Sequence, residues 1–394
     1  MNAAKRSIAT TDHNNNAGRK IAVIGGGLGG LTAALAFARQ GAEVSVYEQA
    51  AALTEVGAGI QITPNGARAL DALGLADALS AKGLRAQAVM PMDGLSGATI
   101  ARFDLTAQVP AYRFFHRAAL IGILADACVA AGVKVHLNSR VTDYRPDGGF
   151  DVAGRTVKPD LTIGADGVQS VLRGRLNGAA QPFFTGQVAW RAIIDQPDAP
   201  PEARIWMFPG RHIVTYPLSE GRLNIVAVQE RDQWADEGWH HADDPAHLRS
   251  AFADCCDPLG AILAKVDTVG LWGLFRHPVA LNWYQGTCAI LGDAAHPTLP
   301  FLAQGANLAV EDAYQLARAT DAAADLGAGL AAYQAARKGR VTRAINAANA
   351  NARNYHLGGV RRIVAHGGLR LIGRAAPGAF LGRLGWLYDF DVTA

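Results

Sequence analysis

One segment near the N-terminus constrains the fold more than any other part of this sequence. Residues 20–48 read KIAVIGGGLGGLTAALAFARQGAEVSVYE. A short apolar strand runs into a glycine turn, good helix formers follow over about 29–40, and a second strand leads to Glu48. This order predicts a strand–helix–strand unit of the kind found in parallel α/β sheets.

The glycines of this segment have the spacing G-x-G-x-x-G, with Gly25, Gly27 and Gly30 at the three positions. The first glycine permits a tight turn, the second lets the backbone approach a pyrophosphate, and the third lets helix and strand pack closely. The helix N-terminus offers free N–H groups to that pyrophosphate, and Glu48 can accept hydrogen bonds from an adenosine ribose. The segment predicts a dinucleotide site; an ordinary strand–helix–strand unit is the alternative.

Composition narrows the classes of protein that this chain could be. With 394 residues, 50% of them hydrophobic and 18% charged, it can bury a large core in two domains or one elaborated domain. A net charge of +3, without a basic run interleaved with aromatic residues, argues against a nucleic-acid partner. The sequence contains no uninterrupted apolar run of about 18 residues, so it predicts no transmembrane helix. The polar, Asn-rich residues 1–19 predict a disordered leader rather than a signal peptide.

The four cysteines, Cys128, Cys255, Cys256 and Cys288, form no C-x-x-C pair. Their spacing suits neither a zinc site nor a disulfide framework. We therefore expect no metal site and a reducing, cytoplasmic location.

Two kinds of sequence pattern predict two domains. Residues 20–82, 103–178 and 284–345 carry the short apolar strands and helices of an α/β dinucleotide-binding domain, whereas 83–102 and 179–283 predict a substrate domain. In the latter, the alternating runs 211–218 and 222–228 predict an antiparallel sheet, with one helix at about 245–254. Residues 346–394 form a C-terminal helical segment.

The predicted substrate domain is rich in tryptophan. Its tryptophans either form the scaffold of the sheet or provide an aromatic wall that faces a flat substrate. Both interpretations stay open for five of the seven tryptophans: Trp190, Trp206, Trp234, Trp239 and Trp272.

The segment from Leu326 to Tyr388 contains ten Arg or Lys residues and no Asp or Glu. Its apolar positions could form amphipathic helices with a cationic surface for a membrane or an anionic substrate. We favour the plainer interpretation that these helices cap the first domain and keep their arginines in solvent.

Three predicted strands end at or next to a carboxylate: Glu48, Asp166 and Asp293. Ligands of α/β sheets bind in crevices at the carboxyl ends of strands, so three such ends suit a long, extended dinucleotide. We expect Asp293 to bind the ribityl hydroxyls of a flavin. Asp166, which precedes Gly167, is either part of the same site or only a turn residue.

Two further segments complete the predicted cofactor site. The helix that opens at Gly305, Ala306 and Asn307 would direct N–H groups at the flavin pyrimidine, where negative charge gathers on reduction. Arg117, at a predicted helix start, either contacts the pyrophosphate or forms a surface ion pair.

Together these motifs resemble those of the class A FAD-dependent aromatic hydroxylases, closest to the group of salicylate hydroxylase, 3-hydroxybenzoate 6-hydroxylase and 6-hydroxynicotinate 3-monooxygenase. The resemblance covers almost the whole chain after residue 19. It implies a para-hydroxybenzoate hydroxylase-like fold, with a Rossmann-like FAD-binding domain, an antiparallel-sheet substrate domain and C-terminal helices. Four blocks carry it: 25–48; 57–61 with Pro64 and Asn65; 164–170 (GADGVQS); and 292–297 (GDAAHP), followed by 304–307 and 311–313.

The resemblance also implies an activity. FAD would be bound, NADH or NADPH would dock transiently to reduce it, and O2 would react with the reduced flavin. A C4a-hydroperoxyflavin would then hydroxylate a phenolic or hydroxy-aromatic acid. The absence of a second G-x-G-x-x-G agrees with transient docking. Such chemistry needs water to be excluded and the phenol to have a hydrogen-bond acceptor or base. A homodimer is a further expectation from the family.

The expected strand at 211–218 carries the candidate base. His212 and Tyr216 are four residues apart, which places both side chains on one face of a strand, and the relatives have a similar His-x-x-x-Tyr. His can accept a phenolic proton near neutral pH. The alternative is a His and a Tyr that only pack on the sheet.

Other roles follow from the resemblance alone. Pro297 would lie beside the flavin ring, whereas His296 is expected to be structural. Gln61 stands where the 6-hydroxynicotinate branch has a His, which makes that substrate less favoured. A substrate carboxylate could be neutralised by any of three arginines, and the sequence selects none: Arg191, Arg204 and Arg211.

Two other functions stay open. The same fold could serve an epoxidase of an isoprenoid or an oxidase of a polyketide, and an epoxidase does not need the phenol-activating pair. A non-hydroxylating flavoprotein is the third hypothesis.

Overall fold

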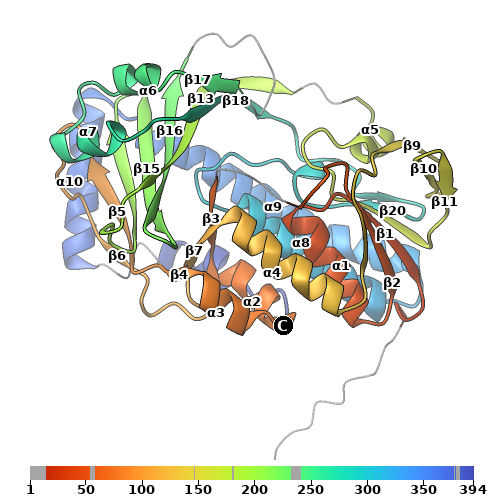
Figure 1. Cartoon of the computed structure of the whole chain (residues 1–394). Helices are drawn as coiled ribbons and strands as arrows, with labels where there is room; N and C mark the ends of the chain where they lie inside the picture. The colour runs from red at the N-terminus through yellow and green to blue at the C-terminus, as the bar shows by residue number, and fades with distance from the viewer. Residues whose placement is uncertain are drawn as a thin grey trace, which may run out of the picture.

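The computed structural model describes residues 15–53, 58–145, 147–179, 182–231, 241–376, 378 and 382–394. Figure 1 shows two large sheets on opposite sides of the molecule, with long helices packed beside them. A Rossmann-like α/β unit is joined to a second, largely antiparallel sheet and to C-terminal helices. The predicted fold class is confirmed.

The first sheet has six strands in the order β19-β20-β12-β1-β2-β8, all parallel to their neighbours except β19. Helices α1 (Leu28–Arg39), α4 (Arg117–Ala130) and α8 (Gly305–Ala322) pack together beside it (Figure 1). Its strands are β1 (Lys20–Ile24), β2 (Glu43–Tyr47), β8 (Lys134–His136), β12 (Leu161–Gly164), β19 (Tyr284–Gln285) and β20 (Cys288–Ile290).

The turn between β1 and α1 has the geometry that its glycines predict. Gly25 adopts a φ of +106°, which L side chains rarely do. A Cβ on Gly30 would lie 2.0 Å from the carbonyl oxygen of Gly25, so α1 can approach β1 this closely only with glycine there. The helix expected at 29–40 is confirmed as α1.

The second sheet has eight strands in the order β17-β18-β13-β16-β15-β14-β5-β6. The strands expected at 211–218 and 222–228 are confirmed as β15 and β16, and only β14 and β5 pair in parallel. Its strands are β5 (Ala88–Asp93), β6 (Phe103–Asp104), β13 (Phe183–Asp195), β14 (Glu202–Phe208), β15 (Arg211–Leu218), β16 (Arg222–Glu230), β17 (His241–Asp243) and β18 (Val269–Arg276).

Two helices cover one face of this sheet where the sequence predicted one. They are α6 (Pro245–Ala251) and α7 (Asp257–Leu263). The proline in the first turn of α7 cannot continue a preceding helix, so it starts a new one.

The face under α6 and α7 is an apolar core. Trp190 and Trp206 lie in it with Phe252 and Leu259. The aromatic-wall interpretation is therefore wrong for these two tryptophans, which act as scaffold. Trp272 belongs to the other core, and Trp234 and Trp239 lie outside the described residues.

The opposite face of the sheet turns toward the first domain. Arg191 on β13 is opposite Val226, and Val226 is opposite Val214, which lies between His212 and Tyr216 on β15. Opposite residues in a ladder share a face. Arg191, His212 and Tyr216 therefore point to the same side, where Tyr216 joins the core of the first domain.

Short elements link the two sheets. Three helices are α2 (Pro64–Ala72), α3 (Ala76–Lys82) and α5 (Val171–Asn177). One small sheet, in the order β3-β7-β4, comprises β3 (Gly59–Ile62), β4 (Leu84–Arg85) and β7 (Arg113–His116). Another comprises β9 (Val141–Tyr144), β10 (Phe150–Val152) and β11 (Arg155–Val157).

The C-terminal part is helical, with α9 (Leu326–Tyr355), α10 (Gly359–Ala375) and α12 (Gly385–Tyr388). α9 runs unbroken through residue 345, where the sequence placed a domain limit, so the limits stay a prediction. The expectation of arginines in solvent is wrong for Arg337, which is buried against Glu311 and Asp312. No helix in the described part of the chain is long and apolar enough to span a membrane.

The prediction of a disordered leader is wrong for its last residues. The side-chain amide of Asn16 is fully buried. Its Nδ2 donates to the carbonyl oxygen of Ala317 and to Oγ1 of Thr320, both at 3.0 Å. These bonds tie residues 15–19 to α8, while residues 1–14 lie outside the described residues.

Candidate active site

The carboxylate of Glu48 lies directly beside the glycine turn. Its Oε2 accepts a hydrogen bond from the N–H of Gly26 at 2.6 Å, and its Oε1 accepts one from the N–H of Ala50 at 2.8 Å. A carboxylate oxygen can accept more than one hydrogen bond. Glu48 could therefore accept bonds from ribose hydroxyls while it stays bound to the turn.

The N-terminus of α1 has room for a ligand. Gly27 is the N-cap residue, and no side chain caps the helix. A Cβ built on Gly27 would meet no atom within 4 Å. The first-turn N–H groups of α1 thus face open space, where a pyrophosphate could accept hydrogen bonds from them.

Asp166 lies on the neighbouring strand end, next to Gly25. Its Oδ2 accepts a hydrogen bond from the N–H of Val171 at 3.1 Å, as a turn residue would. Its Oδ1 is buried and has no hydrogen-bond partner among the described residues, and burial raises the pKa of this carboxyl. A buried acceptor without a donor is costly, which favours an additional partner from a ligand.

Asp293 and Arg117 are far apart in the chain, yet the charge of Arg117 acts on the Asp293 carboxyl. Asp293 lies in a 3-10 turn (η1, Gly292–Ala294) after β20, and Arg117 is the first residue of α4. Burial raises the pKa of Asp293, while the positive charges of His296 and Arg117 oppose that rise. The charge of Arg117 therefore acts on the Asp293 carboxyl, which supports a place for Arg117 in the candidate site.

The N-terminus of α8 begins at Gly305, as the sequence predicts. The side chain of Asn307 is used within the protein: Oδ1 accepts from the N–H of Thr63, and Nδ2 donates to the carbonyl oxygens of Gln61 and Ala303. Only the backbone N–H groups of this turn are therefore candidates for hydrogen bonds to a flavin. The side chain of Asn307 instead joins α8 to β3.

These features fit FAD. An uncapped helix and an open glycine turn suit a pyrophosphate, a carboxylate stands at the end of β2, and Asp166 offers an unpartnered acceptor. Asp293 and the N-terminus of α8 lie at the far end of the same edge of the sheet.

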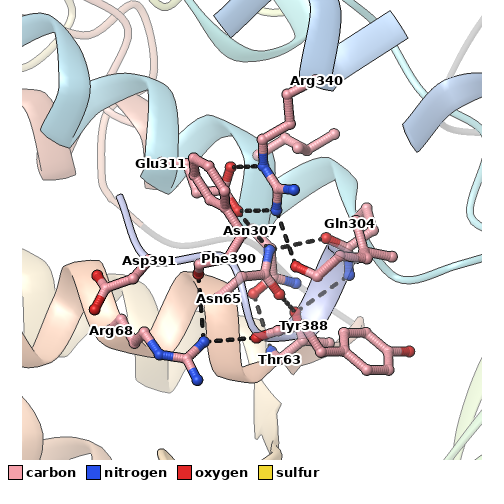
Figure 2. Close-up of polar contacts among 12 residues, drawn as sticks. Thr63, Asn65, Arg68, Gln304, Asn307, Glu311, Arg340, Tyr388, Phe390 and Asp391 are labelled. Atoms are coloured by element: carbon pink, nitrogen blue, oxygen red, sulfur yellow. Dashed lines mark hydrogen bonds and ion pairs between the residues drawn. The ribbon is translucent and has the colours of Figure 1, made fainter. Parts of the chain in front are cut away.

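A buried polar network supports the α8 end of the site (Figure 2). Asn65 Nδ2 donates to Gln304 Oε1 at 3.0 Å and to Glu311 Oε1 at 2.6 Å. Arg340 of α9 donates to Glu311 through Nε and Nη2, both at 2.8 Å. Arg68 of α2 donates a hydrogen bond to the carbonyl oxygen of Tyr388 at 2.6 Å. This bond joins the C-terminal tail to α2.

His296 is part of this support, in agreement with the structural role expected for it. Its Nε2 is hydrogen-bonded to Asp312, and both residues are fully buried. Asp312 also accepts hydrogen bonds from the N–H of Gly292 at 3.1 Å and from Arg337 Nε at 2.7 Å. Burial acts to raise the pKa of Asp312, but the charges of His296 and Arg337 outweigh it and lower that pKa to about 2.

On the substrate side, Gln61 joins two aromatic hydroxyls. Tyr112 donates to Gln61 Oε1 at 2.5 Å, and a side-chain hydrogen bond links Gln61 to Tyr216. Burial raises the pKa of both tyrosines, so their hydroxyls keep their protons. Tyr112 has no motif around it and was missed by sequence reasoning.

His212 is fully buried and lies between aromatic rings. Its ring centroid is 5.5 Å from that of Phe301 and 5.2 Å from that of Tyr355. Burial, with a smaller contribution from His356, lowers the pKa of His212 well below its usual value, so the ring is neutral. Phe301 follows the buried Pro297 in the loop before α8, which brings His212 to the predicted flavin side.

The structure places the three candidate arginines in different surroundings. Arg204 pairs with Glu202 at 3.2 Å, and Arg211 pairs with Asp254 at the outside of the sheet. Arg191 instead shares a face with His212 and Tyr216, and its charge acts on the hydroxyl of Tyr216. Its guanidinium stacks 4.5 Å from the ring of Trp272. Of the three, Arg191 is therefore the one that lies on the face of the candidate base.

Comparisons with known proteins identify the family and the cofactor. The family described as FAD binding domain matches residues 19–348. The 3-amino-4-hydroxybenzoate 2-monooxygenase PtnB3 of Streptomyces platensis is 34% identical over 390 residues, 95% of this chain and 96% of that protein. The 3-hydroxybenzoate 6-hydroxylase of Polaromonas naphthalenivorans is 33% identical over 401 residues, 96% of this chain and 98% of that protein. Among solved structures, an HpxO variant of Klebsiella pneumoniae complexed with FAD matches with a TM-score of 0.81 and 26% identity, covering 93% and 98% of the two chains.

The fold and the site define a flavoprotein of the Rossmann-like, two-domain type. The chain belongs to the FAD binding domain family and is an FAD-dependent NAD(P)H monooxygenase, as its resemblance to the class A aromatic hydroxylases predicted.

Proposed function

We propose that this enzyme hydroxylates a phenolic or hydroxy-aromatic acid that binds between β15 and the loop before α8. The observation that carries the proposal is one sheet face that presents a neutral imidazole, a tyrosine hydroxyl and a guanidinium: His212, Tyr216 and Arg191. A phenol needs the first two groups and a ring carboxylate needs the third. The relatives named above act on 3-hydroxybenzoate and 3-amino-4-hydroxybenzoate, and both are hydroxybenzoates.

The residues of the FAD site have separate tasks in this proposal. Glu48 would hold the adenosine ribose, the Gly25–Gly27 turn and α1 would hold the pyrophosphate together with Arg117, and Asp293 would hold the ribityl chain. The first-turn N–H groups of α8 would stabilise negative charge that develops on the flavin pyrimidine. When bound, FAD supplies hydride acceptance from NAD(P)H and the activation of O2.

The substrate residues then orient and activate the ring. Arg191 pairs with the carboxylate, which fixes the position of the ring. A lone pair of His212 accepts the phenolic proton, which makes the ring electron-rich. Tyr216 and Tyr112, joined through Gln61, stay protonated and donate hydrogen bonds. Phe301 and Tyr355 keep water from the imidazole.

The test is a substrate screen with the purified yellow holoenzyme. Phenols, hydroxybenzoates and aminohydroxybenzoates are each added with NADH or NADPH, and we measure nicotinamide oxidation, O2 uptake and product mass. A hydroxybenzoate that stimulates oxidation and gains one oxygen atom supports the proposal. Stimulation only by an isoprenoid or a polyketide would instead favour an epoxidase or oxidase, and no stimulation at all would favour a non-hydroxylating flavoprotein.

We further propose a cytoplasmic homodimer. All four cysteines are free, which suits a reducing compartment, and the dimer is a family expectation. Light scattering on the purified holoenzyme tests the dimer.

A further inference from the structure

A chain of three titratable side chains leads from the candidate substrate site to solvent. Nδ1 of His212 is 2.7 Å from Nε2 of His356, and Nδ1 of His356 is 2.7 Å from Oε1 of Glu230. The side chain of His356 is 3% exposed, whereas that of Glu230 is 54% exposed. The chain therefore starts in a buried face and ends at the surface.

The end residue determines which nitrogen carries each proton. An ionised carboxylate only accepts hydrogen bonds, so Nδ1 of His356 carries the proton. Burial lowers the pKa of His356 and of His212, so both rings are neutral. Nε2 of His356 is then an acceptor, Nδ1 of His212 is the donor to it, and Nε2 of His212 keeps a free lone pair.

The backbone holds this chain in place. Gly210, in the turn between β14 and β15, donates its N–H to the carbonyl oxygen of His356 and accepts from the N–H of Glu230, both at 3.0 Å. Its φ of +69° favours glycine. His356 itself is the C-cap residue of α9. This single turn therefore positions both His356 and Glu230.

We propose that His212, His356 and Glu230 form a proton relay between the substrate phenol and solvent. The phenolic proton moves to Nε2 of His212, the Nδ1 proton of His212 moves to Nε2 of His356, and the Nδ1 proton of His356 moves to Glu230 and then to water. One proton leaves for each one accepted, and the reverse sequence reprotonates the product. His212 is the residue that touches substrate; His356 and Glu230 act through it.

The relay rests on the proposed function, and an experiment can separate the two. Oxidised holoenzyme is mixed with 3-hydroxybenzoate, and with the best phenol of the substrate screen, in weak buffer containing phenol red. Proton release is followed by stopped flow. Glu230→Gln keeps the shape of the exposed side chain and an oxygen that accepts a hydrogen bond, but it removes the carboxylate that can take up a proton. Glu220→Gln removes the same charge from the exposed β15–β16 turn and is the matched control.

We expect Glu230→Gln to slow proton release at least roughly tenfold, with little change in ligand affinity, and Glu220→Gln to behave like the wild type. A second variant, His356→Ala, should be slow and should regain its rate when imidazole is added. Wild-type rates in Glu230→Gln, or no rescue of a folded His356→Ala protein, would overturn the relay alone. A wild-type enzyme that neither releases a proton nor hydroxylates any phenol would overturn the proposed function, and the relay with it.

Discussion

Two buried histidines, His296 and His212, differ in what lies beyond their hydrogen-bond partner. His296 is bonded to Asp312, which is itself bonded to Arg337 and to the backbone of Gly292. His212 is bonded to His356, which is bonded to a carboxylate at the surface. Both rings are buried and both have a partner, so burial and hydrogen bonding alone do not identify a catalytic histidine.

The difference lies in whether the last group of each network can exchange a proton. The pKa of Asp312 is about 2, so this carboxylate stays ionised at neutral pH and does not pass a proton on. We call His296, Asp312 and Arg337 the closed network. Glu230 meets water and can pass a proton on. The first network therefore stabilises the fold of α8 and α9, and the second connects the candidate substrate site to solvent.

The largest effect should come from breaking the closed network. Arg337→Met leaves the buried Glu311 and Asp312 with one fewer cation, and removing one partner of a buried ion pair costs about 3–5 kcal/mol. We expect a matching fall in the free energy of unfolding, measured by denaturant titration. Arg361→Met on the exposed face of α10 is the control and should stay within about 0.5 kcal/mol of wild type. Equal stability of both variants would remove the structural role assigned to the closed network.

Replacing each histidine in turn sharpens the comparison. His212→Asn should lower kcat/KM for the phenol about 100-fold, because general-base assistance is lost, while a large part of NADH oxidation becomes uncoupled from product. His296→Asn should mainly lower the melting temperature. Product formed per NADH, measured on holoenzyme matched for FAD content, separates the two. Unchanged yield and rate in His212→Asn would contradict the base assignment.

The smallest effect should come from two neighbours on β13 that point to opposite faces. Arg191→Gln removes a charged hydrogen bond worth about 1.5 kcal/mol, so KM for a hydroxybenzoate should rise roughly tenfold. KM for a phenol without a carboxylate should not change. Trp190→Phe alters the core under α6 and α7, and it should lower the melting temperature without changing either KM. An equal rise of KM for both ligands would argue against carboxylate binding by Arg191.

Local patterns in the sequence predicted the elements that depend on short-range geometry. The glycine spacing, the strand ends and the alternation on β15 are local, and they led to α1, to the FAD site and to the shared face of His212 and Tyr216. The separate helix α7 and the ordered residues 15–19 were missed. The first depends on a proline that restarts a helix, and the second on hydrogen bonds between Asn16 and α8, far along the chain.

What the sequence determined by itself was the FAD cofactor and the family, because each motif acts through its own backbone turn. What only the tertiary structure decided was which side chains share the face of the candidate substrate site. The choice of Arg191 over Arg204 and Arg211 follows from the sheet register, which places Arg191 on the face that carries His212 and Tyr216. The partnership of His212 with His356 and Glu230 joins residues up to 144 positions apart. Contacts over such distances depend on where the C-terminal end of α9 meets β15 and β16, which no local pattern encodes.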